Sequence, residues 1–291
     1  MKSYTGLLNY YKKITQDTST DNASLGAENI NDTIREIISL PYAWDFLEET
    51  ATDTTVASQQ SYFFPYNYEK LYSTTITVGN FKYPITEVTS RKKWDELQIT
   101  TAVTSNIPQK FFVDAGKIYY WPTPSTNGNT ITYNFKKAVR DLSVADYTTG
   151  TVTLTNGSKA VTGSGTTFTA AMVGRYIQGS TDKYWYKIAS YTNATSITLE
   201  KNFGGITVAG ESYTIGEMPI LPETYHNVPV WKAAQIFWTM KGKDENRATM
   251  FETMYKEGLQ RLIADHGSKT SSPVIEDGRE GIINPNLTIW L

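Results

Sequence analysis

Two pairs of neighbouring acids, Glu48-Glu49 and Asp95-Glu96, have side chains of the type that cleaves glycosidic bonds, and each pair has a tryptophan close by that could stack on a sugar. Glycoside hydrolysis needs two carboxylates held at a defined separation across a cleft. Nothing in the spacing of these residues sets such a separation. Solvated charges at the ends of helices or strands are the better account of both pairs.

The chain has two histidines, His226 and His266, and no cysteine. Without cysteine there are no thiolate metal ligands, no cysteine nucleophile and no disulfides. His226 has no second histidine four residues away, as a helical zinc pair requires, so we interpret it as a helix-surface or interface residue. His266 follows Asp265, and adjacent residues of a helix do not face each other. We therefore expect no catalytic, cofactor-binding or metal-binding residues, and no enzyme activity.

A glycine-rich stretch, Gly163-Ser164-Gly165-Thr166, is a candidate for binding phosphate. However, Phe168 occupies the position of the third glycine in the dinucleotide-binding fingerprint, and no lysine follows at the spacing of a Walker motif. The pattern therefore predicts a plain turn.

Basic residues occur only in short clusters: Lys12-Lys13, Arg91-Lys92-Lys93 and Lys136-Lys137. The net charge of −2 and the pI of about 5.8 exclude a global basic field that would attract nucleic acid. Clusters of this size usually belong to solvated faces, although they could line a pore that contacts phosphate. No segment is long and apolar enough to span a membrane, so no membrane partner is expected.

Two helices are predicted near the N-terminus, one from Tyr4 to Ile14 and a second that ends before Pro41. The second helix has apolar residues at a spacing of three to four along one face and polar residues on the other. The apolar stripe consists of Ala23, Ala27, Ile30, Ile34, Ile37 and Ile38, and the polar face of Glu28, Asn31, Asp32, Arg35 and Glu36.

From Thr50 the pattern changes to short runs rich in β-branched and aromatic residues, which favour strands. We predict a hairpin over 74–83 with the two-residue turn Gly79-Asn80, a second hairpin over 110–121, and a strand over 130–138.

Residues 148–216 differ in composition, being rich in glycine, threonine and serine, with short strands at close spacing. This pattern is typical of a small sandwich or barrel, with Trp185 in its core. The ends of the stretch, Tyr147 and Gly216, lie between otherwise continuous elements, so we predict a β module inserted into a loop of the remaining chain.

Two further helices follow. The first, from Pro222 to Met240, is apolar nearly all round and should be the central buried helix. The second begins after the cap residue Asp244 and ends at Gly267 in the left-handed position that follows many helices. The predicted helical core comprises Ile30, Ile34, Ile37, Trp231, Phe237, Phe251, Tyr255 and Leu259.

The predicted fold class is α+β: a helical bundle formed by both chain ends plus a β-sheet region, with an inserted all-β small domain. Residues 1–147 and 217–266 would form the body, residues 148–216 the module, and residues 267–291 an extended tail.

The last ten residues are apolar and follow a polar, glycine-punctuated linker from Gly267 to Gly281. An exposed apolar end promotes aggregation unless it docks on its own core or on another subunit. Fully extended, the segment from Gly267 spans up to about 80 Å, so it can leave its own domain. The predicted docking residues are Ile282, Ile283, Leu287, Ile289, Trp290 and Leu291.

Several motifs occur in a recognisable order along the chain. They are Ile34-Arg35-Glu36-Ile37, the run from Tyr42 to Glu48, Tyr62-Phe63-Phe64-Pro65, the run from Tyr119 to Pro124, and the run from Leu221 to His226. This order resembles the head-to-tail adaptor (connector) proteins of tailed bacteriophages, over residues 20–147 and 217–266. The stretch between is similar to small β modules carried by phage structural proteins.

The resemblance implies a structural virion protein of the phage neck, made in the host cytoplasm and without catalysis or a cofactor. Such adaptors form a ring, usually a dodecamer, that lies beneath the portal, extends the DNA channel and gives the tail its attachment surface. The partners it implies are further copies of this chain, the portal protein, tail or neck proteins, and genomic DNA that passes without sequence recognition. In relatives the C-terminal segment reaches the portal.

Two other functions stay open. One is a different neck component, such as a tail terminator or stopper. The other, based on the 7 tryptophans and 20 tyrosines, is a carbohydrate-binding or glycan-cleaving protein.

Overall fold

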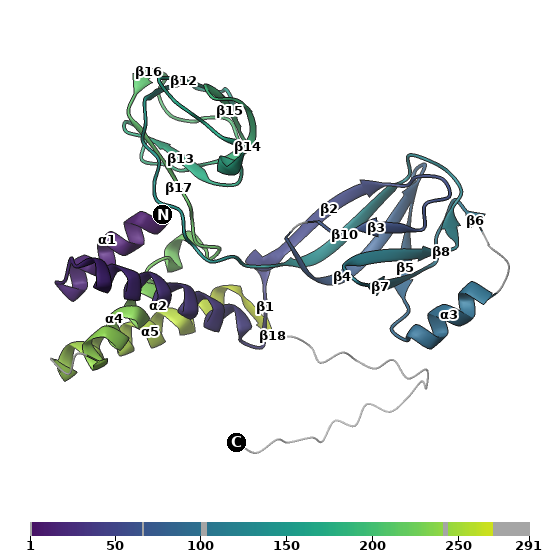
Figure 1. The fold of residues 1–291 in the computed structure, drawn as a ribbon, viewed down its shortest axis with the longest axis horizontal. Helices are drawn as coiled ribbons and strands as arrows, with labels where there is room; N and C mark the ends of the chain where they lie inside the picture. The colour runs from purple at the N-terminus through teal and green to yellow at the C-terminus, as the bar shows by residue number, and fades with distance from the viewer. Residues whose placement is uncertain (1, 66, 100–103, 241–243, 270–291) are drawn as a thin grey trace.

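A computed structural model describes residues 2–65, 67–99, 104–240 and 244–269 of the chain. Figure 1 shows three parts: a group of helices built from both chain ends, and two curled sheets that stand apart from each other. Within the described residues, three hydrophobic clusters lie one in each part.

The helical part contains α1 (Tyr4–Thr15), α2 (Thr20–Ser39), α4 (Val228–Met240) and α5 (Glu245–His266). Side chains of Ser3, Ser19 and Asp244 accept hydrogen bonds from backbone N–H groups in the first turns of α1, α2 and α5. Such caps satisfy donors that a helix leaves unpaired at its start, which is why these helices begin where they do.

The core between these helices is apolar. Of the residues predicted for it, those that are less than a tenth exposed are Ile30, Ile34, Ile37, Phe237, Phe251 and Tyr255, while Trp231 and Leu259 are partly buried against the same cluster. The helices pack closely at Gly26 of α2, where a Cβ atom would come within 2.3 Å of the Tyr11 ring of α1.

The first sheet has seven strands in the order β2-β10-β4-β5-β7-β8-β3, and only β5 and β7 pair in parallel. The strands are β2 (Glu48–Thr54), β3 (Ser61–Phe63), β4 (Tyr68–Val78), β5 (Phe81–Glu87), β7 (Lys110–Asp114), β8 (Lys117–Trp121) and β10 (Thr130–Lys137). The helix α3 (Arg91–Ile99) follows β5, and β6 (Thr104–Ser105) pairs with β9 (Thr123–Pro124) beside the sheet. The predicted hairpins over 74–83 and 110–121 are confirmed as β4–β5 and β7–β8.

The second sheet also has seven strands, all antiparallel, in the order β16-β11-β12-β15-β14-β13-β17. They are β11 (Thr151–Leu154), β12 (Ala160–Ser164), β13 (Tyr176–Gly179), β14 (Tyr186–Asn193), β15 (Ser196–Leu199), β16 (Val208–Glu211) and β17 (Tyr213–Gly216). The sheet curls around its own cluster of twelve buried side chains, which includes Leu154, Ile177 and Ile197.

The predicted fold class, an α+β fold centred on a helical bundle, is wrong. The structure is 33% helix and 34% strand, with two curled seven-stranded sheets, and it is a β-rich fold. The strand content was underestimated because β2 lies at a sheet edge and has the polar sequence Glu-Glu-Thr-Ala-Thr-Asp-Thr, with six of its seven residues exposed. An edge strand of this kind lacks the apolar alternation that identifies a half-buried strand.

Three local predictions are also wrong. The helix expected from Pro222 begins instead at Val228, after a single 3-10 turn over Glu223–Tyr225. Gly267 is extended, with a φ of −95°, and opens the short strand β18 (Gly267–Lys269), which pairs with β1 (Tyr42–Trp44). Trp185 is only partly buried and lies outside the core cluster of the second sheet, which Tyr186 contacts in its place.

His226 is buried as well, with 2% of its surface exposed, so its interpretation as a helix-surface or interface residue is wrong. The backbone N–H of Lys2 lies 3.1 Å from Nδ1 of His226, and the carbonyl of Leu221 lies 3.0 Å from its Nε2. The neutral imidazole can accept the first of these bonds and donate the second. Burial lowers the pKa of His226 below the ordinary value for histidine.

This lowered pKa makes the protein less stable in acid. The unfolded chain binds a proton at His226 more readily than the folded chain, so its stabilising effect is present above the ordinary histidine pKa of 6.5 and is lost as the pH falls toward the lower folded-state value. We expect the free energy of unfolding, measured with urea, to fall on acidification below about pH 6.5 more steeply in the wild type than in His226→Gln. Parallel pH profiles of the two proteins would contradict the assignment.

Candidate functional site

The acidic pairs do not face each other across a cleft. Glu48 and Glu49 are exposed on the edge strand β2, where Glu49 accepts a hydrogen bond from Asn67 at 3.0 Å. Asp95 lies on α3 and forms an ion pair with Arg91 at 2.9 Å. Both pairs are therefore surface charges on separate elements, as expected.

The predicted turn over residues 163–166 is found only in its second half, because Gly163 and Ser164 belong to β12. Gly165 has a φ of +65°, and the Thr166 hydroxyl donates to the carbonyl of Ala194 at 2.9 Å, which leaves it engaged within the sheet. A Cβ on Gly163 would come within 2.2 Å of that same hydroxyl oxygen, so the loop is filled by its own side chain.

The basic clusters lie on the surface, and several of their members form ion pairs. Lys136 pairs with Glu69 at 2.7 Å, and Arg91 pairs with Asp114 at 2.8 Å as well as with Asp95. Lys12 and Lys13 lie in the last turn of α1.

His266 contacts Asp45 with its Nδ1 3.0 Å from each carboxylate oxygen, whereas Asp265 accepts a hydrogen bond from Tyr225. In the part of the chain that the structure describes, no group of three or more potential ligand side chains is placed to hold a metal ion. No helix among these residues is long and apolar enough to cross a membrane.

The feature that organises the described chain is the place where its three parts meet. Two segments pass through it: residues 138–147 lead from β10 of the first sheet to β11 of the second, and residues 217–221 lead back from β17 toward α4. We call these two segments the junction. Figure 1 shows them running between the helices and the two sheets.

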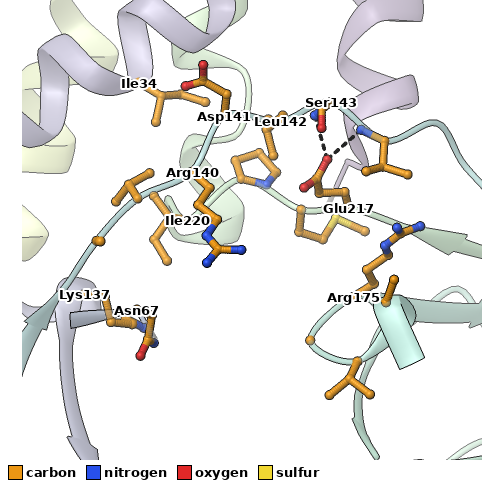
Figure 2. A pocket seen from close by; sticks show the side chains of 18 residues that line it. Ile34, Asn67, Lys137, Arg140, Asp141, Leu142, Ser143, Arg175, Glu217 and Ile220 are labelled. Atoms are coloured by element: carbon orange, nitrogen blue, oxygen red, sulfur yellow. Dashed lines mark hydrogen bonds between the residues drawn. The ribbon is translucent and has the colours of Figure 1, made fainter. Parts of the chain in front are cut away.

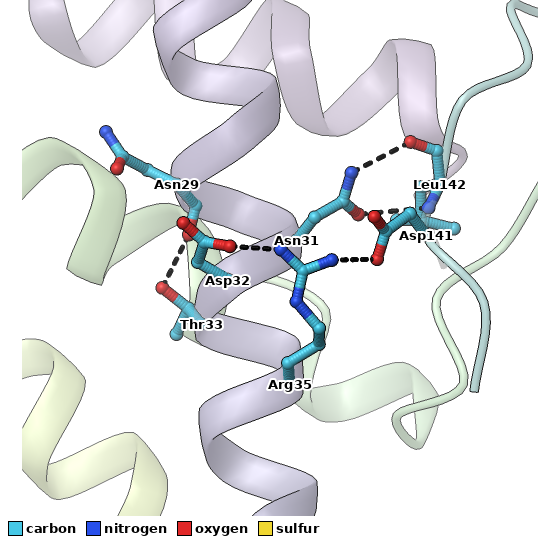
Figure 3. A network of polar contacts seen from close by, with 7 residues as sticks. All are labelled: Asn29, Asn31, Asp32, Thr33, Arg35, Asp141 and Leu142. Carbon is cyan, nitrogen blue, oxygen red and sulfur yellow. Dashed lines mark hydrogen bonds and ion pairs between the residues drawn. The ribbon is translucent and has the colours of Figure 1, made fainter. Parts of the chain in front are cut away.

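One side of the junction is held by α2 (Figure 3). The Asn31 amide donates to the carbonyl of Leu142 at 2.9 Å and accepts from its backbone N–H at 3.0 Å, so one side chain satisfies both backbone groups. Arg35, one turn further along α2, bonds both Asp141 and Asp32, and these bonds raise the pKa of its guanidinium. Leu142 itself is 5% exposed in the helical core.

The two junction segments are also bonded to each other. One carboxylate oxygen of Glu217 accepts hydrogen bonds from the backbone N–H groups of Ser143 and Val144, both at 2.8 Å (Figure 2). Hydrogen bonds to a charged acceptor are stronger than neutral ones. The backbone carbonyl of Glu217 accepts a further bond from the N–H of Tyr4 at 2.8 Å, so the same residue ties α1 to the junction.

The start of α1 completes the arrangement. The Ser3 hydroxyl donates to the carboxylate of Asp146 at 2.8 Å, and the backbone N–H of Asp146 donates to the hydroxyl of Thr5 at 2.9 Å. Gly216 leaves room for this contact, since a Cβ there would come within 2.5 Å of the Ser3 Cβ.

A cavity of about 460 Å³ opens beside the junction (Figure 2). Arg140 extends toward it from the first segment, and Arg175 lies at its edge on the side of the second sheet. The carboxylates of Asp141 and Glu217 in its lining are already bonded to Arg35 and to the backbone, respectively. The lining contains no histidine.

Sequence reasoning placed Asn31 and Arg35 on the polar face of α2 but did not identify their partners. These partners are a loop backbone and an acid more than a hundred residues away, and neither has a local pattern. The predicted tail residues Ile282, Ile283, Leu287, Ile289, Trp290 and Leu291 lie outside the described residues.

The junction bonds can be tested with two asparagines of α2. Asn31→Ala leaves the N–H and carbonyl of the buried Leu142 without their partner, and we expect the free energy of unfolding to fall by about 1–3 kcal/mol. We also expect faster proteolysis within residues 138–147. The matched control is Asn29→Ala on the same helix, because the buried Nδ2 of Asn29 has no hydrogen-bond partner among the described residues. Equal losses in the two variants would show that the amide of Asn31 has no special role.

Comparison with known proteins agrees with a structural role. No curated protein matches the chain. The model of the SU10 adaptor protein family matches residues 2–160, more than half of the chain. The match covers α1, α2, the whole first sheet, the first junction segment and the start of the second sheet. The family points to a phage adaptor-type structural protein, and this chain belongs to the SU10 adaptor protein family.

Proposed function

We propose that the protein forms a ring in the phage neck, between the portal and the tail, where it extends the DNA channel and provides the tail attachment surface. The observation that carries the proposal is the match of the SU10 adaptor protein family over residues 2–160. The ring is proposed to be a dodecamer of this chain, in contact with the portal protein and with tail or neck proteins. The net charge of −2 suits a channel through which DNA slides without adhering.

The junction supports this role. In a ring under a DNA-filled head, the three parts of each subunit must keep their relative orientation while neighbouring subunits exert force on them. Glu217, Asn31 and Ser3 each bond a different pair of segments, which distributes a load over several hydrogen bonds.

We further propose that residues 148–216 are a module inserted into an adaptor body formed by 1–147 and 217–266. The two ends of this stretch lie side by side, because Tyr147 and Ile215 exchange backbone hydrogen bonds of 2.9 and 2.8 Å. Insertions are best tolerated where the two ends of the inserted segment are close together.

Excision of the module tests this division. In a two-residue hairpin the flanking residues exchange two backbone hydrogen bonds, as Tyr147 and Ile215 do, so replacing residues 148–214 with Asn-Gly should close the chain without strain. We expect the shortened protein to keep its helical circular dichroism and to unfold cooperatively, and the isolated segment 146–217 to fold on its own. Aggregation of the shortened protein, together with an unfolded isolated segment, would show that the two parts form one folding unit.

The C-terminal segment is proposed to dock on the portal protein through Ile282, Ile283, Leu287, Ile289, Trp290 and Leu291. These residues are apolar, and an apolar segment can fill a groove or add a strand to a partner. If each segment bound with millimolar affinity, about −4 kcal/mol, many segments linked in one ring would still hold firmly.

Deletion of residues 282–291 should therefore leave a folded, ring-forming protein whose binding to purified portal is weaker by about 100-fold or more, because the multivalent contact is lost. Electron microscopy of the full chain with portal should show a twelve-fold ring attached to it. The matched control is the double variant Asn284→Ser/Asn286→Ser, which changes polar residues of the same segment and should bind normally. Normal portal binding by the deletion variant would reject the docking role, and a six-fold ring on the tail tube would favour a tail terminator.

A further inference from the structure

The second sheet carries an aromatic pocket. It lies between the loop that joins β13 to β14 and the loop that follows β15, and it has a volume of about 500 Å³. Its lining residues are Tyr176, Tyr184, Trp185, Tyr186, Lys187, Glu200, Lys201, Asn202 and Gly204. This volume lies within the range of about 300–1,000 Å³ that is usual for small-ligand sites.

Two aromatic side chains of the pocket, Tyr184 and Trp185, do not serve the core of the sheet. Tyr184 is 75% exposed, and Trp185 is only partly buried and outside the core cluster. Exposing large aromatic surface costs free energy, because each apolar Å² left in water forfeits about 25 cal/mol. Two adjacent aromatic residues at the mouth of one pocket therefore indicate a surface that a ligand covers.

The loop that carries Tyr184 and Trp185 is ordered by hydrogen bonds within residues 180–186. One oxygen of the Asp182 carboxylate accepts a hydrogen bond from the N–H of Tyr184 at 3.1 Å, and the other accepts from the hydroxyl of Tyr186 at 2.6 Å. Lys183 donates from Nζ to the carbonyl of Ser180 at 3.0 Å. A loop that is already ordered loses little conformational entropy when a ligand binds.

The second loop is fixed against the first. The backbone N–H of Gly204 donates to the Tyr186 hydroxyl at 3.2 Å, and the Asn156 amide donates to the carbonyl of Gly205 at 2.8 Å. A Cβ on Gly205 would come within 2.6 Å of the Asp182 carboxylate, so the two loops are in close contact. Both walls of the pocket are thus preformed.

Polar groups in the pocket include both donors and acceptors. Nζ of Lys187 lies 3.1 Å from the Glu200 carboxylate, which leaves further acceptor sites on that carboxylate, and the side chain of Asn202 supplies a carbonyl and an amide. Two lysines, Lys187 and Lys201, disfavour a cationic ligand. A single-stranded nucleic acid would require a positively charged groove. The ion pair between Lys187 and Glu200 removes much of the positive charge of the two lysines, which disfavours such a ligand.

A pyranose sugar matches this combination, because it presents a flat face of C–H groups to an aromatic ring and a rim of hydroxyls to donors and acceptors. We propose that the pocket binds a saccharide, whose ring stacks on Trp185 and Tyr184 and whose hydroxyls bond Glu200, Lys187 and Asn202. None of the pocket residues belongs to the junction or to the C-terminal segment.

The test is calorimetric titration of the full chain with three probes: maltohexaose, chitohexaose and hexagalacturonate, which are neutral, amide-bearing and acidic. We expect saturable binding of at least one probe. Trp185→Ala should weaken that binding about tenfold or more, equivalent to about 1.4 kcal/mol. Asn202→Ala should weaken it without removing an aromatic ring, which separates hydrogen bonding from stacking.

The matched control is Tyr191→Ala, at an aromatic residue of the adjoining strand β14 that is 37% exposed and outside the pocket lining. It should bind the probe as the wild type does, and all variants should keep the wild-type melting temperature. Failure of all three probes to bind, or equal binding by Trp185→Ala, overturns the proposal. Loss of self-association in Trp185→Ala without any saccharide binding also overturns it and assigns the pocket to a protein interface.

Discussion

Two chain segments must pass each other at the point where three separate hydrophobic cores meet, and the hydrogen bonds of the junction are the interaction on which the rest of the structure depends. Among the described residues, the helical core reaches the junction through Leu142 and Leu221, but no cluster joins two of the three parts, so apolar burial alone does not fix how the parts are oriented. The carboxylate of Glu217 and the amide of Asn31 fix the orientation of the parts, because they form hydrogen bonds with backbone groups that would otherwise be left to bond water. Directional bonds are suited to this purpose, because the hydrophobic effect is non-directional.

The sequence predicts the helices and hairpins well where the signal is local. The cap at Asp244 and the turn at Gly79-Asn80 each act within a few residues, and both occur in the structure. Features that depend on distant partners could not be predicted. The strand β2 is polar because it borders solvent, and β18 forms only because residues 42–44 lie beside it.

The candidate sites follow the same rule. His226 has the sequence context of a helix start, yet it is buried because the N-terminal residue Lys2 folds over it from 224 positions away. Trp185 was expected in the core on the general ground that large aromatics are buried. Trp185 instead lies in the loop immediately before β14, and its neighbour Tyr186, the first residue of that strand, contacts Phe203 and the core in its place.

The family match ends at residue 160, the first residue of β12 in the second sheet. A two-stranded hairpin is marginally stable at best, so β11 and the start of β12 can be ordered only with strands that lie beyond the match. The matched range is therefore not a structural unit, and the sheet must be completed by residues that family membership does not describe. The aromatic pocket, over residues 176–204, lies wholly in this second region. The match to the adaptor family thus covers α1, α2, the first sheet and the first junction segment, whereas a ligand of the second sheet has to be inferred from the pocket itself.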